Sequence, residues 1–191
     1  EEGFESVSSG GLNSFTVEGL ASKLFISKKT IYEYFPSKEK LLEKIVRYRI
    51  GVVKRHIKEI IEKNSNPVLQ FVEMKRYIFK FTSRFDSNRM VEFKSKYPDI
   101  WEMIESMRLD NKHNFVKILS EGQEQGYVRK ELDVNFVSTL YVSIINSTFQ
   151  PEFFVKNNIS YSDSLQVYTN IMSYGLFTSK GIKILQDKKF I

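Results

Sequence analysis

The hydrophobic residues of this 191-residue chain recur every three or four positions along most of its length, the spacing of amphipathic helices. The longest example spans residues 37–63, where the apolar positions are Leu41, Leu42, Ile45, Val46, Ile50, Val53, Ile57, Ile60 and Ile61. Charged residues fill the positions between them, and Asn64-Ser65-Asn66-Pro67 ends the pattern. We therefore expect one long helix there.

The same periodicity predicts further helices downstream, at residues 68–85, 90–96, 100 to about 125, from 133 onward, and 165–185. We expect Asp99 to cap the third of these, Gly126 to end it, and Asp133 to cap the next. The last helix is expected to be disturbed at Gly175. The β-branched run at 142–145 has strand propensity, but its helical context and flanking breaks favour helix. The sequence thus predicts an all-α fold.

Residues 16–46 predict two short helices joined by a tight turn, then the start of a third. Val17, Leu20, Ala21 and Leu24 share one helical face, Ser27 can cap the second helix, and Pro36-Ser37 stops it. The second helix leaves its remaining side chains facing outward: Lys28, Lys29, Thr30, Tyr32, Glu33 and Tyr34. Short polar and basic side chains near a helix N-terminus are typical of a recognition helix that enters the major groove.

Residues 1–15 predict the end of a helix followed by a Ser/Gly-rich loop at 8–14. Gly3 suits the C-cap of that helix. A helix that ends so early indicates that most of it lies upstream of the first residue.

Composition narrows the class of protein. The chain has no cysteine, which excludes disulfides, thiol catalysis and cysteine-ligated metals, and fits a reducing, cytoplasmic compartment. No apolar run approaches membrane-spanning length, and the acidic start does not resemble a signal peptide. We therefore expect no membrane partner.

The formal charge of +6 is unevenly distributed. Residues 16–63 hold 12 Lys and Arg against 6 Glu, whereas residues 1–15 hold three Glu and no base. A basic stretch alone is usually a solvated face. Here it coincides with the recognition-helix pattern, and the two together favour double-stranded DNA as a partner.

The segment 20–42, Leu-Ala-Ser-Lys-Leu-Phe-Ile-Ser-Lys-Lys-Thr-Ile-Tyr-Glu-Tyr-Phe-Pro-Ser-Lys-Glu-Lys-Leu-Leu, resembles the helix-turn-helix signature of TetR-type transcriptional regulators. Glu2-Gly3-Phe4 is similar to the end of that family's first helix, and Tyr127-Val128-Arg129 to the connector before its dimerisation helices. The specific motif covers residues 16–46; the rest agrees in helix pattern only. One departure is Phe25, which stands where the family usually has a glycine in a left-handed turn conformation, at a cost of about 1 kcal/mol.

The resemblance implies an all-helical homodimer that binds a palindromic operator and releases it when a small molecule binds. It divides the chain into a helix-turn-helix DNA-binding domain, residues 1–46, and a helical ligand-binding and dimerisation domain, residues 47–191. The DNA-binding residues that it implies are Thr16, Ser27, Lys28, Lys29, Thr30, Tyr32, Tyr34 and Lys38.

The last two expected helices are apolar over a broad face, which favours a twofold dimer through a four-helix bundle; the alternative is a monomer whose helices form an ordinary core. Aromatic residues and methionines in the C-terminal part predict an apolar pocket for a hydrophobic or aromatic ligand, although any one of them could be plain core. These candidates are Phe79, Phe85, Tyr97, Trp101, Met103, Met107, Phe115, Tyr141 and Phe149.

An enzyme is the weaker alternative. Asp110 and His113 lie three apart on one helix, but with His56 as the only other histidine they make a poor metal set, and we expect neither metal nor cofactor. The sequence has no phosphate-binding glycine loop, nucleophile elbow or paired catalytic carboxylates. A third possibility is a dimeric ligand-binding protein whose head does not bind DNA, which the unusual Phe25 would favour.

Overall fold

The computed structural model describes residues 2–6 and 15–190, and helices account for nearly all of the regular structure in these ranges. After the helical residues 2–6, the helices are α2 (Val17–Lys23), α3 (Lys28–Tyr34), α4 (Lys38–Lys63), α5 (Pro67–Thr82), α6 (Ser87–Lys96), α7 (Pro98–Asp110), α8 (Lys112–Glu124), α9 (Val134–Ser147), α10 (Pro151–Asn157), α11 (Tyr161–Leu176) and α12 (Ser179–Asp187). Within the described ranges the extended pairing is an isolated antiparallel bridge between Val128 and Phe177. The predicted all-α fold is confirmed.

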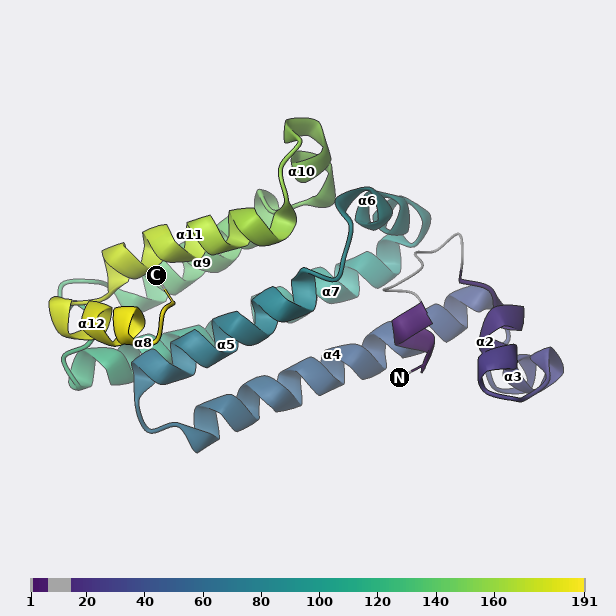
Figure 1. The fold of residues 1–191 in the computed structure, drawn as a ribbon, viewed down its shortest axis with the longest axis horizontal. Helices are drawn as coiled ribbons and strands as arrows, with labels where there is room; N and C mark the ends of the chain where they lie inside the picture. The colour runs from purple at the N-terminus through teal and green to yellow at the C-terminus, as the bar shows by residue number, and fades with distance from the viewer. Residues whose placement is uncertain (1, 7–14, 191) are drawn as a thin grey trace.

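The small N-terminal head contains α2 and α3, which are joined by a tight turn. The head lies at the end of the molecule where α4 begins (Figure 1). Each of the three helices begins at a hydroxyl cap: the side chains of Thr16, Ser27 and Ser37 accept hydrogen bonds from the backbone amides of Gly19, Thr30 and Lys40. The starts after Ser27 and Ser37 agree with the sequence prediction, whereas the capping role of Thr16 was not predicted. The expected Ser8–Ser14 loop lies outside the described residues.

The helix α4 runs along one side of the molecule and joins the head to the body (Figure 1). Its first turns supply Leu41 and Leu42 to a cluster with residues of the head and with residues of α6, α7 and the junction between them: Phe93, Tyr97, Ile100 and Trp101. Further along, Val53, Ile57 and Ile61 belong to the main core of the body. Residue 46, the expected domain boundary, therefore falls inside a continuous helix.

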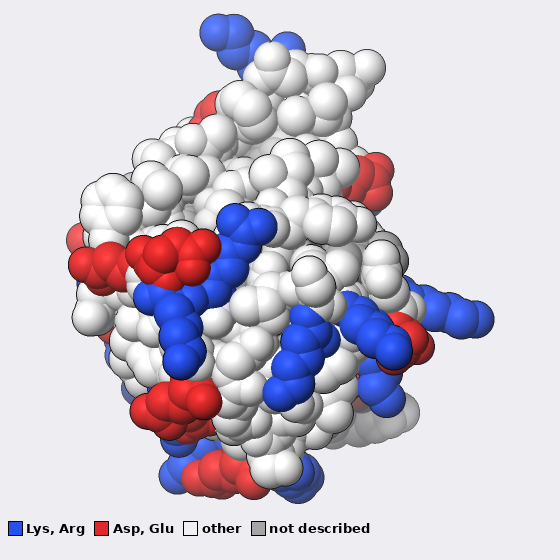
Figure 2. Space-filling model, turned by 90° about the vertical axis from the view of Figure 1, so that its left-hand side faces the viewer, with Lys and Arg blue, Asp and Glu red and all other residues white. Residues whose placement is uncertain are grey.

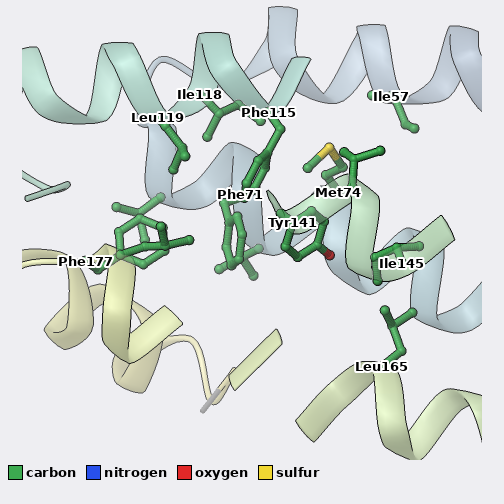
Figure 3. Close-up of a cluster of buried hydrophobic side chains, with 14 of the residues drawn as sticks. Ile57, Phe71, Met74, Phe115, Ile118, Leu119, Tyr141, Ile145, Leu165 and Phe177 are labelled. Atoms are coloured by element: carbon green, nitrogen blue, oxygen red, sulfur yellow. The ribbon is translucent and has the colours of Figure 1, made fainter. Parts of the chain in front are cut away.

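The core of the body is built around aromatic side chains from several helices. Phe71 of α5, Phe115 of α8 and Tyr141 of α9 converge there, and the rings of Phe115 and Tyr141 stack with centroids 4.6 Å apart (Figure 3). Phe177 reaches the same core from the segment after α11, with its ring 5.2 Å from that of Phe71. Offset and edge-to-face pairs of this kind stabilise a core beyond simple burial of area.

Several expected boundaries were wrong. The helix expected at 100–125 is two helices separated at Asn111, and the one expected at 165–185 is interrupted at Phe177 and Thr178 rather than at Gly175. Asp99 lies in the first turn of α7, whose N-cap is Tyr97, because Pro98 occupies the first helical position. The short helix α10 was not predicted at all.

The break after α11 has a structural reason. The backbone of Thr178 donates to the Tyr127 carbonyl, and Arg129 donates to Leu176, so the chain pairs with the 127–129 connector instead of continuing the helix. Gly3 was also misassigned. It lies within the helical residues 2–6, where a Cβ would approach Ile45 of α4 to 2.6 Å.

Candidate nucleic-acid interface

The helix α3 presents most of its circumference to solvent. Of its seven residues, only Ile31 is buried, against the head cluster that includes Leu20 and Ala21 of α2. Lys28, Lys29, Tyr32, Glu33 and Tyr34 are exposed, and the side chain of Tyr34 is 76% accessible. The structure therefore exposes four of the predicted DNA-binding residues on α3, Lys28, Lys29, Tyr32 and Tyr34, while Ile31 anchors the helix.

The N-terminal lysine of α3 is held by an acid from α2. Lys28 Nζ forms an ion pair with the Glu18 carboxylate and lies 5.7 Å from the centre of the Tyr32 ring. The hydrogen bond between the two lowers the pKa of Glu18 and raises that of Lys28. Both side chains are about half exposed, so the pair positions Lys28 without removing it from a phosphate's reach. Sequence reasoning missed this role of Glu18.

Three of the predicted DNA-binding residues carry hydroxyls that take part in helix capping. Thr16 and Ser27 are caps, and Thr30 contacts Ser27. Thr16 and Ser27 accept backbone hydrogen bonds as described, and the hydroxyls of Ser27 and Thr30 lie 2.8 Å apart. A hydroxyl that accepts a backbone N–H still has its own proton to donate. Thr16 and Ser27 can therefore cap their helices and donate to phosphate oxygens at the same time.

Lys38 has a different position from the other lysines. Its Nζ donates to the Phe15 carbonyl at 2.5 Å and lies 5.4 Å from the centre of the Phe15 ring, and the side chain is partly buried. Burial, with the nearby Lys96, lowers the pKa of Lys38. Lys38 thus ties the start of α4 to the residue before α2 and supports the head as well as adding positive charge.

The turn between α2 and α3 keeps a left-handed residue despite the absence of glycine. Phe25 has φ of 55°, and its side chain is 95% exposed. The Ile26 amide donates to the Ala21 carbonyl and the Phe25 amide to Ser22, which close the end of α2. The phenylalanine therefore leaves the turn intact and accepts the backbone strain.

We expect Phe25→Gly to raise the free energy of unfolding by up to about 1 kcal/mol, because glycine adopts a positive φ without strain and the exposed ring contributes no packing. Urea denaturation measures the change. Phe25→Ala is the matched control: it removes the ring, keeps the strain, and is expected to leave stability nearly unchanged. A loss of stability in the glycine variant would contradict this account of the turn.

The end of the molecule opposite to the head has mixed charge. Figure 2 shows Lys and Arg side chains scattered over that end, several of them beside Asp or Glu, with uncharged surface between. The face therefore offers no continuous positive surface. This contrast favours the head as the place where a polyanion binds.

The body contains a cavity between α4, α5, α7, α8, α9 and α11. Its main part has a volume of about 590 Å³ and includes Ile57, Met74, Phe115, Tyr141 and Leu165 in its lining. A narrower apolar part of about 140 Å³ extends toward the head, where Phe93 and Trp101 line it. The two parts share lining residues: Val53, Phe81, Thr82, Ile104, Met107, Arg108 and Tyr161.

The predicted pocket residues divide into two groups. Phe115 and Tyr141 line the main part, Phe85 and Trp101 the narrow part, and Met107 both. The other four candidates line neither part. Phe79 faces a separate recess near α11, Met103 is half-buried beside Arg47, and Phe149 packs in the core. Tyr97 is buried in the head cluster.

A second apolar surface covers α9 and α11, which contact each other through the stacked rings of Tyr141 and Tyr168, 5.3 Å apart. The exposed residues are Phe136 and Leu140 on α9 and Val167, Ile171 and Tyr174 on α11. Within each helix they are separated by three or four positions and so form stripes. Exposed apolar stripes on adjacent helices indicate an interaction surface.

Neither a metal centre nor a membrane segment is present in the part of the chain that the structure describes. The Asp110 carboxylate pairs with Lys54 at 2.8 Å, and no group of three metal-ligating side chains comes together in residues 2–6 and 15–190. None of the described helices combines the length and apolar character needed to cross a bilayer.

Comparison with known proteins agrees with this arrangement. Residues 1–45 match the profile of "Bacterial regulatory proteins, tetR family". The match covers the helix-turn-helix head, and the all-α fold of the chain agrees with that of TetR-type DNA-binding transcriptional regulators.

Relatives extend the similarity beyond the head. YvaF of Bacillus subtilis, described as an uncharacterized HTH-type transcriptional regulator, is 25% identical over 164 residues, which cover 85% of this chain and 86% of YvaF. The repressor KstR2 of Mycobacterium tuberculosis is 23% identical over 144 residues, 70% of this chain and 72% of KstR2. A transcriptional regulator from Cytophaga hutchinsonii, 15% identical, shares the fold with a TM-score of 0.71 over 93% of this TetR-type chain and 95% of its own.

The sequence analysis also failed to predict two cationic residues of the cavity. Lys75 lies four residues after Phe71 on the buried face of α5, and Arg108 lies four after Ile104 on α7. A charged residue at a core-facing position of a helical repeat is the signal that would have found both.

Proposed function

We propose that this TetR-type protein is a cytoplasmic repressor that binds a palindromic operator as a homodimer and releases it when a small, largely apolar ligand enters the body. The observation that carries the proposal is α3, a helix that buries one residue and exposes lysines and tyrosines. Residues 1–46 are assigned to DNA binding, and residues 47–191 to ligand binding and dimerisation.

The residues of the head take different roles in this proposal. Lys28, Lys29 and Thr30 face the major groove from the N-terminus of α3, and Tyr32 and Tyr34 contact phosphates or base edges. Thr16 and Ser27 donate hydroxyl hydrogen bonds to phosphates, and Lys38 adds charge while it holds the head together. Phosphate contacts set the register and give salt-dependent affinity, while few side chains read bases.

The apolar stripes of α9 and α11 are the proposed dimer interface. A twofold interface uses the same surface on both subunits, and two helices from each subunit form a four-helix bundle. Such a dimer places two copies of α3 for successive major grooves, about 34–36 Å apart.

Ligand release follows from the way the cavity adjoins the head. Trp101 lines the narrow part of the cavity and also belongs to the cluster that holds Leu41, Leu42 and the two head helices. A ligand that displaces Trp101 or Ile104 shifts the packing on which the head rests. Ligand binding then favours a dimer whose two α3 helices no longer match the groove spacing.

Selection from a pool of random-sequence DNA duplexes tests the proposal. We expect the purified protein to enrich inverted repeats with half-sites about one helical turn apart, and to bind the enriched duplex far more tightly than a scrambled one. Equal affinity for all duplexes would contradict operator recognition and would favour the alternative, a dimeric ligand-binding protein whose head does not bind DNA. Phe25 offers that alternative little support, because the turn is intact.

We expect Lys28→Ala and Lys29→Ala each to weaken operator binding and to reduce the slope of log affinity against log salt by about 0.9, the contribution of one phosphate contact. Glu18→Gln is expected to act in the opposite direction and tighten binding several-fold, because it removes a negative charge that competes with the phosphates for Lys28. Fluorescence anisotropy over a salt series measures both quantities.

Lys130→Ala, at an exposed site after α8, is the control for the loss of a lysine far from the head. It is expected to change neither affinity nor slope. Lys38→Ala is also expected to weaken binding, but it removes the contact with Phe15 and so lowers the stability of the head as well. Unchanged salt slopes in both α3 variants would contradict the assignment of α3 to phosphate and groove contacts.

A further inference from the structure

Lys75 is a lysine in the apolar core of the body. Only 6% of its surface is accessible, and its Nζ lies 5.4 Å, 5.0 Å and 3.9 Å from the ring centres of Phe71, Phe115 and Tyr141. Its hydrogen-bond partner is the Tyr141 hydroxyl. Since the ammonium has three N–H donors and this hydroxyl accepts one, two donors are left for a ligand in the cavity that Lys75 lines.

No acid of the described chain neutralises this amine. The carboxylate in the lining of the main cavity is Asp110, which pairs with Lys54 at 2.8 Å. The carboxylate in the narrow part is Asp86, which caps α6 by accepting from the Arg89 amide. Lys75 therefore stands in an aromatic setting without a carboxylate partner, and its burial lowers its pKa to about 7.

A second cation faces the same space without its full set of partners. Arg108 lines both parts of the cavity, with its guanidinium 5.4 Å from the centre of the Trp101 ring. One terminal nitrogen of this guanidinium is buried and has no hydrogen-bond acceptor in the described structure. A buried donor left unsatisfied is unfavourable, and the positive charge of the guanidinium favours an anion over a cation in the same space.

From this arrangement we propose that the cavity binds an amphipathic carboxylate, whose head group pairs with Lys75 and the Tyr141 hydroxyl and whose apolar part extends past Arg108 toward Trp101. The inference rests on the proposed function in assigning the ligand to this cavity, and adds its chemical class. The shape of the cavity agrees with this ligand class, because Lys75 lies in the larger main part and the apolar extension is narrow.

The charges select among other ligand classes. A cationic ligand would place a third positive charge beside Lys75 and Arg108 in a site of low dielectric, where like charges repel strongly. A neutral apolar ligand would leave the Lys75 donors unsatisfied. A carboxylate accepts from these donors and has the opposite charge to both cations, and a charge-assisted hydrogen bond is about twice as strong as a neutral one.

The test compares straight-chain carboxylates of six to fourteen carbons and 2-naphthoate with the corresponding primary alcohols. Trp101, the only tryptophan of the chain, lines the narrow part and reports binding by its fluorescence. Isothermal titration calorimetry gives the affinity independently. We expect at least one carboxylate to bind at least tenfold more tightly than its alcohol, and this preference to disappear in Lys75→Met.

Lys80→Met is the matched control, since it makes the same substitution at an exposed position of α5 and is expected to keep the preference. Tyr141→Phe removes only the hydroxyl and is expected to reduce the preference in part. Arg108→Met is expected to lower the affinity for the longest carboxylates and for the longest alcohols to the same extent.

Equal binding of acid and alcohol, no binding of any carboxylate, or a preference that survives in Lys75→Met would overturn the proposal. Operator binding is measured separately with and without the tightest carboxylate. If that carboxylate binds but the operator is not released, the ligand assignment stands and ligand-released repression fails. If the protein binds no operator at all, the calorimetric result still decides the ligand class.

Discussion

Ile171→Glu is expected to convert the proposed dimer into a monomer and to lower operator affinity at least 100-fold. Ile171 is 65% exposed at the middle of the α11 stripe, between Val167 and Tyr174. In a twofold interface each substitution buries two carboxylates, one from each subunit, and neither has a cationic partner on the stripe. A monomer carries one α3 and so loses half of the operator contacts.

Analytical ultracentrifugation measures the first effect as a change from twice the chain mass of 22.5 kDa to that mass itself. Fluorescence anisotropy with the selected operator measures the second. Leu109→Glu is the matched control, because Leu109 of α7 is also apolar and half exposed but lies outside the two stripes. A variant that remains dimeric would place the interface elsewhere; a monomer with full affinity would separate dimerisation from operator binding.

Lys75→Met is expected to raise the free energy of unfolding of the ligand-free protein by about 2–4 kcal/mol at pH 6. Below pH 7 the buried amine is charged in the folded state without a carboxylate partner, which is unfavourable. Methionine keeps the length and packs well against aromatic rings. The substituted protein therefore gains stability while it loses the proposed head-group partner.

The gain in the free energy of unfolding that Lys75→Met brings is expected to become smaller as the pH rises. Burial lowers the pKa of Lys75 from 10.5 to about 7 in the folded protein. Between these values the unfolded chain binds a proton that the folded chain does not, so the stability of the unsubstituted protein rises with pH. The advantage of Lys75→Met is therefore full below pH 7, smaller at pH 9, and absent near pH 10.5.

Urea denaturation of both proteins at pH 6 and pH 9 measures this difference. The other ionisable residues that line the same cavity are present in both proteins: Lys54, Lys58, Arg108, Asp110, His113, Tyr141 and Tyr161. Lys80→Met is expected to show a small effect at both values. A gain that does not depend on pH would indicate altered packing rather than removal of a buried charge.

The sequence predicted the head more accurately than the body, and the reason is local. The helix starts at Thr16, Ser27, Ser37 and Asp133 depend on a side chain and an amide two or three residues away, which a short window of sequence contains. The exposed surface of α3 follows from the same local pattern, because Ile31 is the one residue of this helix that is buried.

The breaks in the body depend on distant contacts. The interruption after Leu176 is stabilised by pairing with residues 127–129, about fifty positions earlier, which periodicity does not reveal. The end of α7 at Asp110 carries no proline or glycine, so the pattern there reads as one continuous helix. The helix α10 packs mainly on α6, far away in the sequence, and its start at Pro151 was overlooked.

The pocket was predicted by residue type and only partly by position. Aromatic residues are common in any core, so Phe149 and Tyr97 could not be distinguished from Phe115 and Tyr141 without the tertiary structure. The two cations were the more informative residues, since a lysine on a buried helical face is rare unless something pairs with it.

The continuity of α4 has a mechanical consequence. A helix of 26 residues is about 39 Å long, and this one contacts the cavity through Val53 and the head through Leu41 and Leu42. A pivot of about 5° near its far end swings the other end by roughly 3 Å. In the proposed dimer the two swings add across the twofold axis, to a mismatch of about 6 Å between the two copies of α3. Each α4 would then act as a lever, so that a small movement beside the cavity produces a larger one at the head.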